Sequence, residues 1–446
     1  MGKYFGTDGF RGEAGVTLTS EHAFKIGRYL GWYYGKEHKA KIVIGKDTRR
    51  SSYMLEYALV AGLCASGADA YLLHVTTTPS VAYVTRTEDF DAGIMISASH
   101  NPYYDNGIKI INSRGEKMSE SITDEIEEYL DREKDTIPFA KGEAVGCTVD
   151  YVLGRNRYTG YILSLAKHSY KDLRIGLDSA NGATWMLAKS IFDTLGAKTY
   201  VIGNTPNGLN INDSCGSTHT EALSELVVRE GLDIGFAFDG DADRCLAVDS
   251  DGRLITGDNI LYFSAKYMKA RGELCADTVV ATVMSNLGLF RALEREGIKC
   301  VKTDVGDRFV YEAMQKGGYS LGGEESGHII FSKYSSTGDG LITAIKIMEI
   351  LIESKDSSPR LSAGFTRYPQ ITKNVRVADK NAPLADPEVK DALTRAEKML
   401  ADEGRILLRK SGTEPVIRIM AESESEETCR KAIDIVKEKL KKYSVE

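Results

Sequence analysis

KIVIGKDTR, residues 41–49, is a short run of β-branched and apolar residues that ends in polar turn residues and leads into a helix-like stretch. The same pattern recurs in LRIGLDSANGA, residues 173–183, and in TVVATVMSN, residues 278–286. Strands of a parallel sheet have this composition because helices cover both faces of the sheet. The sequence therefore predicts three α/β domains of similar build, repeated at domain-sized intervals.

The C-terminal part has a different pattern. QITKNVRV, GRILLRKSG and VIRIMAE look like strands separated by helical stretches, which predicts a smaller α+β domain from about Tyr368 onward. Its last helix should pack on its own sheet through an apolar face with the three-and-four spacing of an amphipathic helix. That face consists of Cys429, Ala432, Ile433, Val436 and Leu440.

Length, charge and hydropathy limit the class of protein. A length of 446 residues suggests about three domains and perhaps a smaller one, at roughly 150 residues per domain. A net charge of −7 argues against nucleic acid as the main partner, because binding a polyanion needs a basic face. No stretch is long and apolar enough for a transmembrane helix, and the N-terminus lacks the apolar run of a signal peptide, so we expect a cytoplasmic protein.

ISASHNPYYDN, residues 96–106, places Ser99 at the end of an apolar, strand-like run. The serine could be a nucleophile, a phosphate carrier or only a turn former before Asn101-Pro102. The sequence around it is neither a G-x-S-x-G elbow nor a phosphate-binding P-loop, and no histidine pair has zinc-site spacing. A phosphate carrier is the remaining catalytic role, provided that a metal ion can neutralise the phosphate.

FAFDGDADRCLAV, residues 236–248, offers such a metal site. Asp239, Asp241 and Asp243 alternate along a glycine-containing loop and can converge on one hard cation, although a solvated acidic loop has the same appearance. An EF-hand is excluded, because its sixth position is Arg244 instead of glycine and its twelfth is Ser250 instead of glutamate. A magnesium site that acts on phosphate is the better hypothesis.

Positive charge occurs where phosphate chemistry would need it. Lys109 lies in DNGIKI, ten residues after Ser99, and Arg11 lies in the glycine-flanked GTDGFRG. RKSGTEPVIR resembles an anion-binding nest, although an ordinary glycine turn would look similar. In GGEESGH, residues 322–328, polar side chains could bind sugar hydroxyls. The nest residues are Arg409, Ser411, Gly412, Thr413 and Arg418, and the sugar-binding candidates are Glu324, Ser326 and His328.

Five elements in a fixed order, GTDGFRG, SASHNPYYDNGIK, DGDADR, GGEESGH and RKSGTEP, resemble the α-D-phosphohexomutase superfamily. KYFGTDGFRG and NGLNINDSCGSTH are most similar to its bacterial phosphoglucosamine mutase branch. The resemblance implies three similar α/β domains and a smaller α+β domain around a central cleft. The expected domains are residues 1–148, with the phosphoserine loop; 149–251, with the metal loop; 252–367, with the sugar loop; and 368–446, with the phosphate-binding loop.

The resemblance also implies an activity, the conversion of glucosamine 6-phosphate to glucosamine 1-phosphate for UDP-N-acetylglucosamine and cell-wall synthesis. Ser99 would carry the transferred phosphate, and the intermediate and activator would be glucosamine or glucose 1,6-bisphosphate. Mg²⁺ would be bound by phosphorylated Ser99, Asp239, Asp241 and Asp243. Glu324 and Ser326 would hold sugar hydroxyls, with His328 nearby, and the C-terminal nest would hold the phosphate that is not reacting. The remaining catalytic candidates are Arg11, His100, Lys109 and Arg244.

Three alternative functions and two interactions with other chains remain open at this point. A phosphomannomutase or phosphoglucomutase would differ only in the group at C2 of the sugar. A regulatory protein without a main catalytic role and a magnesium-dependent phosphatase are further alternatives. The branch suggests a homodimer and a diadenylate cyclase partner. Lys109 as general base is a separate hypothesis, which requires a shifted lysine pKa.

Overall fold

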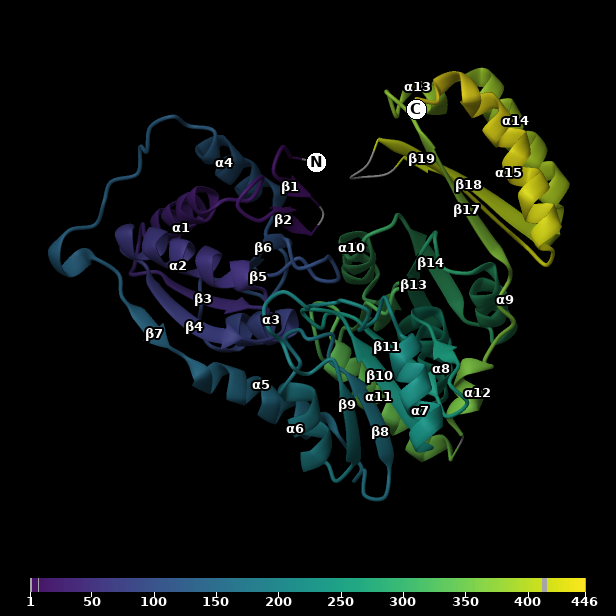
Figure 1. Ribbon diagram of the computed structural model, residues 1–446, viewed down its shortest axis with the longest axis horizontal. Coiled ribbons are helices and arrows are strands. Elements are labelled where there is room, and N and C mark those ends of the chain that lie inside the picture. The colour runs from purple at the N-terminus through teal and green to yellow at the C-terminus, as the bar shows by residue number, and fades with distance from the viewer. Residues whose placement is uncertain (1, 7, 356, 411–414, 446) are drawn as a thin grey trace. The chain divides into compact units, whose positions relative to one another are not determined.

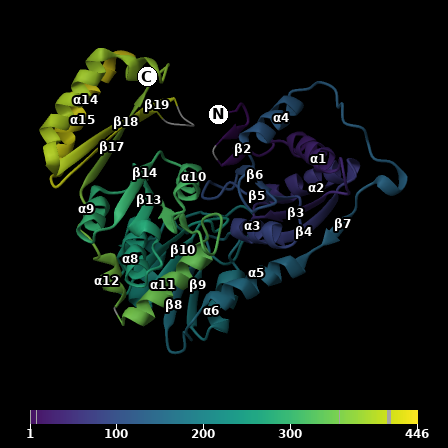
Figure 2. The same ribbon diagram turned by 180° about the vertical axis from the view of Figure 1, so that it is seen from behind.

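The structure, a computed structural model, describes residues 2–6, 8–355, 357–410 and 415–445. Within these ranges the strands form four sheets. The chain divides into two compact units, one of residues 1–284 with 298–364 and the other of residues 285–297 with 365–446. Figures 1 and 2 show the first unit in purple to green and most of the second in yellow. Short 3-10 helices cover Gly142–Ala144, Cys275–Asp277, Ala401–Glu403 and Lys441–Tyr443.

The first sheet has the strand order β1-β2-β6-β5-β3-β4-β7. The KIVIGKDTR segment forms β3, which is parallel to both β4 and β5, so this prediction is confirmed. Helices α1 and α2 pack against each other, while α3 contacts β3 and β5. The strands are β1 (Phe5–Gly6), β2 (Gly9–Glu13), β3 (Lys41–Lys46), β4 (Asp69–Val75), β5 (Ala92–Ile96), β6 (Asp105–Asn112) and β7 (Thr148–Asp150). The helices are α1 (Ser20–Tyr34), α2 (Arg50–Ala65), α3 (Thr78–Thr87) and α4 (Glu120–Leu130).

The second sheet has the order β12-β11-β10-β8-β9, with β8 parallel to β9 and β10. Strand β8 lies within the second predicted segment. Strand β10 is buried along its whole length, as expected for a strand covered on both faces. The strands are β8 (Arg174–Asp178), β9 (Lys198–Ile202), β10 (Ile234–Phe238), β11 (Cys245–Asp249) and β12 (Leu254–Ile255). The helices are α5 (Val152–Leu165), α6 (Leu187–Thr194) and α7 (Glu221–Glu230).

The third sheet has the order β14-β13-β15-β16. Its fully buried strand β13 comes from the third predicted segment and is parallel to β14 and β15. The strands are β13 (Thr278–Thr282), β14 (Lys299–Thr303), β15 (Leu321–Gly323) and β16 (Ile329–Phe331). The helices are α8 (Gly257–Ala270), α10 (Asp307–Gly317), α11 (Gly340–Ser354) and α12 (Ser358–Ser362).

The second unit contains an antiparallel sheet of order β17-β19-β18. Helices α14 and α15 lie side by side on it in both views (Figures 1 and 2). The predicted apolar face of α15 is buried in the core of this unit, which confirms that the last helix packs on its own sheet. The strands are β17 (Gln370–Arg376), β18 (Gly404–Lys410) and β19 (Val416–Ser423), and the helices are α9 (Leu287–Arg295), α13 (Ala382–Ala385), α14 (Pro387–Leu400) and α15 (Glu426–Leu440).

A buried carboxyl group at the start of α11 makes the first unit sensitive to pH. Asp339 caps the helix by accepting a hydrogen bond from the Ile342 backbone N–H at 3.0 Å and another from the Tyr158 hydroxyl at 2.8 Å. Burial raises the pKa of Asp339 from 3.8 to about 6, although these hydrogen bonds oppose the shift. Between these two pKa values the folded form retains a proton that the unfolded chain has lost. The stability that this proton provides is therefore complete below pH 3.8 and is lost as pH rises through about 6.

We expect the substitution Asp339→Asn to stabilise the protein at pH 7.5 but much less at pH 4. Asparagine keeps the cap without the buried charge, and the rise of the Asp339 pKa from 3.8 to about 6 corresponds to about 3 kcal/mol at pH 7.5. Thermal unfolding of both proteins at the two pH values measures the difference. An equal change in Tm at pH 4 and pH 7.5 would show that the Asp339 carboxyl does not titrate in this range.

Candidate active site

Ser99 lies in the turn of residues 97–105 that joins β5 to β6 (the Ser99 turn), and only 1% of its own surface is exposed. Its hydroxyl donates a hydrogen bond of 2.6 Å to Asp239 Oδ2 and lies 3.3 Å from His100 Nδ1. The backbone φ of Ser99 is 52°, a left-handed conformation that costs a residue other than glycine about 1–3 kcal/mol. The turn therefore holds Ser99 in an unfavourable backbone conformation while its hydroxyl faces a carboxylate of the next domain.

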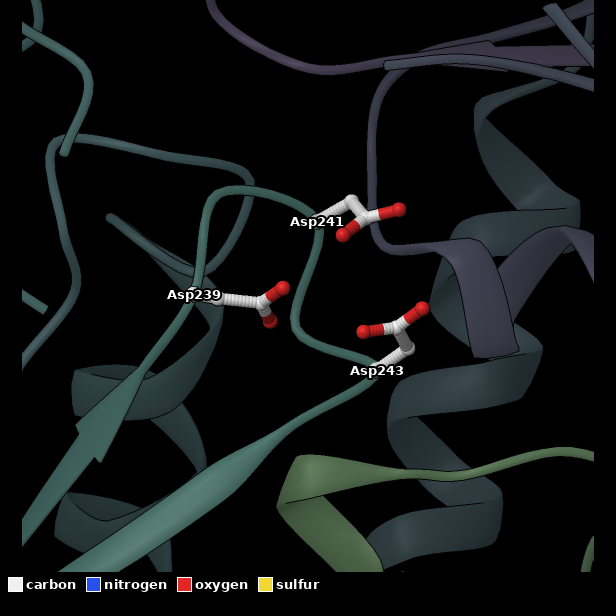
Figure 3. A group of neighbouring side chains, drawn as sticks. All are labelled: Asp239, Asp241 and Asp243. Atoms are coloured by element: carbon white, nitrogen blue, oxygen red, sulfur yellow. The ribbon is translucent and has the colours of Figure 1, made fainter. Parts of the chain in front are cut away.

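The three aspartates of the acidic loop converge between β10 and β11 (Figure 3). Each offers a carboxylate oxygen, and these oxygens lie within 4.8 Å of one another in a buried site. Gly240 lets this loop approach the Ser99 turn, because a Cβ at this position would lie 2.5 Å from the Ser99 carbonyl oxygen. The loop therefore has the geometry of a cation site directly beside Ser99.

The electrostatics of the loop fit a bound cation. Asp241 Oδ1 and Asp243 Oδ1 are buried and accept no hydrogen bond from the residues that the structure describes. Burial, reinforced by the charges of Asp243 and Asp241, raises the pKa of Asp239 well above its usual value. Hard divalent cations prefer carboxylate oxygens and would remove both the repulsion and the unsatisfied acceptors. The residues therefore fit a metal ion of this type.

Lys109 on β6 contacts two of these carboxylates and that of Asp8. Its Nζ lies 2.8 Å from Asp241 Oδ2, 3.2 Å from Asp243 Oδ2 and 3.2 Å from Asp8 Oδ2. Burial alone would lower the pKa of Lys109, but the three negative charges outweigh it and hold the pKa well above its usual value. Lys109 is therefore a cation at neutral pH, and this shift is opposite to the one that the general-base hypothesis requires.

Three more sequence-predicted residues surround Ser99. Arg11 donates from Nη1 to Asn101 Oδ1 at 3.3 Å and from Nη2 to Asp8. The backbone N–H of Arg244 donates to Asp239 Oδ1 at 3.2 Å, and its Nε lies 4.0 Å from Asp243 Oδ1. Burial, followed by the charges of Arg244 and Arg11, lowers the pKa of half-buried His100 to about 4. His100 is therefore neutral at pH 7.

The GGEESGH loop joins β15 to β16 and brings His328 to the acidic loop. His328 Nδ1 lies 3.9 Å from Asp243 Oδ2, and Glu324 Oε1 accepts a hydrogen bond of 3.1 Å from the Gly306 backbone N–H. A cavity of about 820 Å³ opens beside these residues; Asp8, Lys109, Asp243, Asp307, Arg308 and His328 are among the residues that line it. His328, at the end of this loop, therefore lies beside both the carboxylates and a space large enough for a small ligand, whereas Glu324 and Ser326 do not line that space.

The C-terminal candidates belong to the second unit. Arg409 on β18 is directly opposite Arg418 on β19. Burial and the Arg418 charge lower the pKa of Arg409, and two like charges in direct register favour the binding of an anion between them. The other predicted residues of this nest, Ser411, Gly412 and Thr413, lie outside the described residues.

Several residues of the site were not predicted from the sequence. Asp8 connects Lys109 to Lys117, whose Nζ lies 2.9 Å from Asp8 Oδ1 and 2.6 Å from Asp307 Oδ2. Arg49 and Asn212 contact the backbone of the Ser99 turn. Asp8 lies in GTDGFRG, and Arg49 lies at the end of KIVIGKDTR, directly after a predicted parallel strand. Functional residues of α/β sheets commonly occupy that position, so it could have marked Arg49 as a candidate.

Comparison with known proteins agrees with this architecture. The domain models of the phosphoglucomutase/phosphomannomutase family match residues 2–136 (alpha/beta/alpha domain I), 156–252 (domain II), 256–368 (domain III) and 373–439 (C-terminal domain). The chain belongs to the phosphoglucomutase/phosphomannomutase family, with three α/β domains and a smaller C-terminal domain. Among its full-length relatives are phosphoglucosamine mutases. That of Lachnospira eligens is 63% identical over 439 residues, which cover 98% of each chain, and that of Bacillus licheniformis is 48% identical over 442 residues, which cover 98% of this chain and 99% of the relative.

Solved structures share the fold at lower sequence identity. A phosphoglucomutase/phosphomannomutase family protein from Burkholderia thailandensis has a TM-score of 0.82 at 24% identity, over 99% of this chain and 98% of that one. N-acetylphosphoglucosamine mutase from Aspergillus fumigatus, in complex with GlcNAc-6P and magnesium, has a TM-score of 0.71 at 16% identity, over 99% and 96% of the two chains.

Proposed function

We propose that this chain is a phosphoglucosamine mutase, an isomerase that interconverts glucosamine 6-phosphate and glucosamine 1-phosphate. The observation that carries the proposal is the 2.6 Å hydrogen bond between the Ser99 hydroxyl and Asp239, within a buried group of three carboxylates. This is the arrangement that a phosphorylated serine and a cation would need in order to share one site. The choice of glucosamine is supported by the full-length relatives that carry this name.

The reaction would proceed by two phosphoryl transfers, one from the enzyme to the sugar and one from the sugar back to the enzyme. Phosphoserine 99 loses its phosphoryl group as the Oγ–P bond breaks and a P–O bond forms at O1 of glucosamine 6-phosphate, and the O1 proton ends on the Ser99 oxygen. The glucosamine 1,6-bisphosphate then turns over, Ser99 Oγ takes the phosphoryl group as the O6–P bond breaks, and the serine proton ends on O6. No net phosphate is consumed, and glucose 1,6-bisphosphate could phosphorylate Ser99 in the same way.

Asp239, Asp241 and Asp243 would hold Mg²⁺ together with the phosphate on Ser99. The ion would neutralise charge on the transferring group. Lys109, a cation at neutral pH, and Arg11 and Arg244 would stabilise the same charge. His100, neutral at pH 7 and 3.3 Å from Ser99 Oγ, has a ring nitrogen free of a proton and could accept one near the transferring group.

The remaining predicted residues would recognise the substrate. Glu324 and Ser326 would accept hydrogen bonds from sugar hydroxyls, with His328 beside them. The phosphate that is not reacting would be held by the arginine forks of Arg409 and Arg418. Ser411, Gly412 and Thr413 complete this proposal from the sequence resemblance.

Location and assembly stay predictions. In the part of the chain that the structure describes, we find no helix with the length and apolar character needed to span a bilayer. The cytoplasmic location, the homodimer and the diadenylate cyclase partner rest on the sequence resemblance, as do the domain boundaries at residues 148, 251 and 367.

Phosphorus NMR of the purified protein tests the proposal. The sample contains Mg²⁺, glucosamine 6-phosphate and a trace of glucose 1,6-bisphosphate, with mannose and glucose 6-phosphates as parallel substrates. We expect glucosamine 1-phosphate to accumulate faster than the other sugar 1-phosphates. Faster conversion of mannose or glucose 6-phosphate would make the chain a phosphomannomutase or phosphoglucomutase, and release of inorganic phosphate alone would indicate a phosphatase.

A further inference from the structure

Arg49, the last residue of the KIVIGKDTR segment, binds the backbone of the Ser99 turn. It is fully buried at the start of α2, and all five of its N–H donors have acceptors. Nε donates to Asp47 Oδ2 at 2.7 Å. The remaining donors go to four carbonyl oxygens of the turn, those of Ser99 at 2.9 Å, Asn101 at 2.9 Å, Asp105 at 3.1 Å and Pro102.

Asn212 approaches the same carbonyl groups from the second sheet's domain. Its Nδ2 donates to the carbonyl oxygens of Ser99 at 2.9 Å and of Asn101 at 3.0 Å. Asn212 is itself buried, with a left-handed φ of 58°, and lies in the NGLNINDSCGSTH segment that has no role in the proposed reaction. The Ser99 carbonyl oxygen thus receives donors from two domains.

The N–H group of Ser99 is fixed as well. It donates to Ser97 Oγ at 2.9 Å, and the Ser97 hydroxyl donates to Asp47 Oδ2 at 2.7 Å. Asp47 therefore orients the Arg49 guanidinium and also anchors the start of the turn. With both backbone groups of Ser99 held by buried partners, the direction of its side chain is set by atoms that lie outside the reacting group.

We propose that Arg49 and Asn212 are positioning residues for phosphoryl transfer: together they hold the carbonyl groups of the Ser99 turn so that Ser99 Oγ faces Asp239. The inference rests on the proposed function. The guanidinium neutralises carbonyl dipoles that converge on one point and would otherwise repel one another, and it stabilises the left-handed conformation of Ser99. A small displacement of a reacting oxygen is sufficient to slow transfer strongly.

The test compares Arg49→Ala with a matched control, Arg28→Ala. Arg28 is equally buried, and its guanidinium likewise binds backbone carbonyls and one aspartate, those of Ala65, Ile137, Pro138 and Asp135, but it does not contact the Ser99 turn. Phosphorylation of Ser99 by glucose 1,6-bisphosphate is followed by intact-protein mass spectrometry with Mg²⁺ present, and kcat and KM are measured per folded enzyme. For Arg49→Ala we expect a fall in kcat and in the phosphorylation rate of about 100-fold, with KM changed less than about threefold.

Two further measurements separate positioning from simple destabilisation. Guanidinium ion, below concentrations that unfold the enzyme, should restore part of the Arg49→Ala rate, whereas urea should not. Asn212→Asp, which replaces a donor by an acceptor of the same shape, should lower kcat by about tenfold. The exposed Asn207→Asp is its charge-matched control and should keep the wild-type rate.

The possible outcomes separate failure of the proposed function from failure of the positioning role. If wild-type enzyme does not phosphorylate Ser99, the proposed function and the positioning role are both wrong. If wild type is phosphorylated but Arg49→Ala matches Arg28→Ala, or guanidinium gives no rescue, only the positioning role is wrong. If Arg49→Ala does not fold, Asn212→Asp decides: a rate equal to that of Asn207→Asp overturns the positioning role, and a selective loss of kcat supports it.

Discussion

Mutase activity is expected to disappear when Ser99 is replaced by alanine. In the proposed reaction the phosphoryl group is carried by Ser99 Oγ, and no other group can take over a covalent step at that point. The rate should fall by on the order of 10⁶, the scale of loss when other enzymes lose a covalent nucleophile. Formation of glucosamine 1-phosphate, followed by phosphorus NMR, gives the measurement.

The fold should tolerate this change. Alanine removes one oxygen, and among the described residues the only hydrogen bond lost to a neighbouring domain is the one to Asp239. Thermal unfolding should therefore show a native transition for Ser99→Ala, and Ser190→Ala on the exposed side of α6 serves as the control for activity. A Ser99→Ala enzyme that retains more than a few per cent of the wild-type rate would remove Ser99 from its assigned role.

The second large effect is expected for Asp239→Asn. With one carboxylate lost, the loop should bind Mg²⁺ much more weakly, and the several kcal/mol that a metal ion contributes to the transition state correspond to a loss of about a thousandfold or more in kcat. In the absence of metal the variant should instead unfold at a higher temperature than wild type, because it removes a carboxyl group whose ionisation is opposed by burial and by two neighbouring carboxylates. Activity and stability thus change in opposite directions.

Calorimetry with and without Mg²⁺ measures the second half of this prediction. Wild-type protein should show a Tm that rises with Mg²⁺ concentration, since a ligand of the folded state stabilises it, and Asp239→Asn should lose most of that rise. Asp251→Asn, an exposed aspartate of the turn after β11, should behave as wild type. An unchanged Mg²⁺ response in Asp239→Asn would show that the cation binds elsewhere.

The sequence predicted the parts of this protein that local patterns determine. Three buried parallel strands follow from runs such as TVVAT, and the convergence of Asp239, Asp241 and Asp243 follows from alternation along a short loop. The protonated state of Lys109 could not be predicted, because it depends on carboxylates from separate segments. Arg49 and Asn212 were missed for a related reason: they bind backbone carbonyls, which every residue has, so no side-chain motif marks their partners. Ser99 and Asn212 are also 113 positions apart in the chain.

The position of Lys109 also bears on how the enzyme is made. Its ammonium group already offsets part of the negative charge of Asp241 and Asp243, so the acidic loop has a counter-ion within the polypeptide itself. A domain that relies on metal alone to offset its ligands stays unfolded until the ion arrives. We therefore expect a newly synthesised chain to complete its tertiary structure before it binds a metal ion, and we expect one divalent ion to exchange for another without refolding. Chelation should consequently silence the catalyst while leaving a native protein that regains activity as soon as the ion returns.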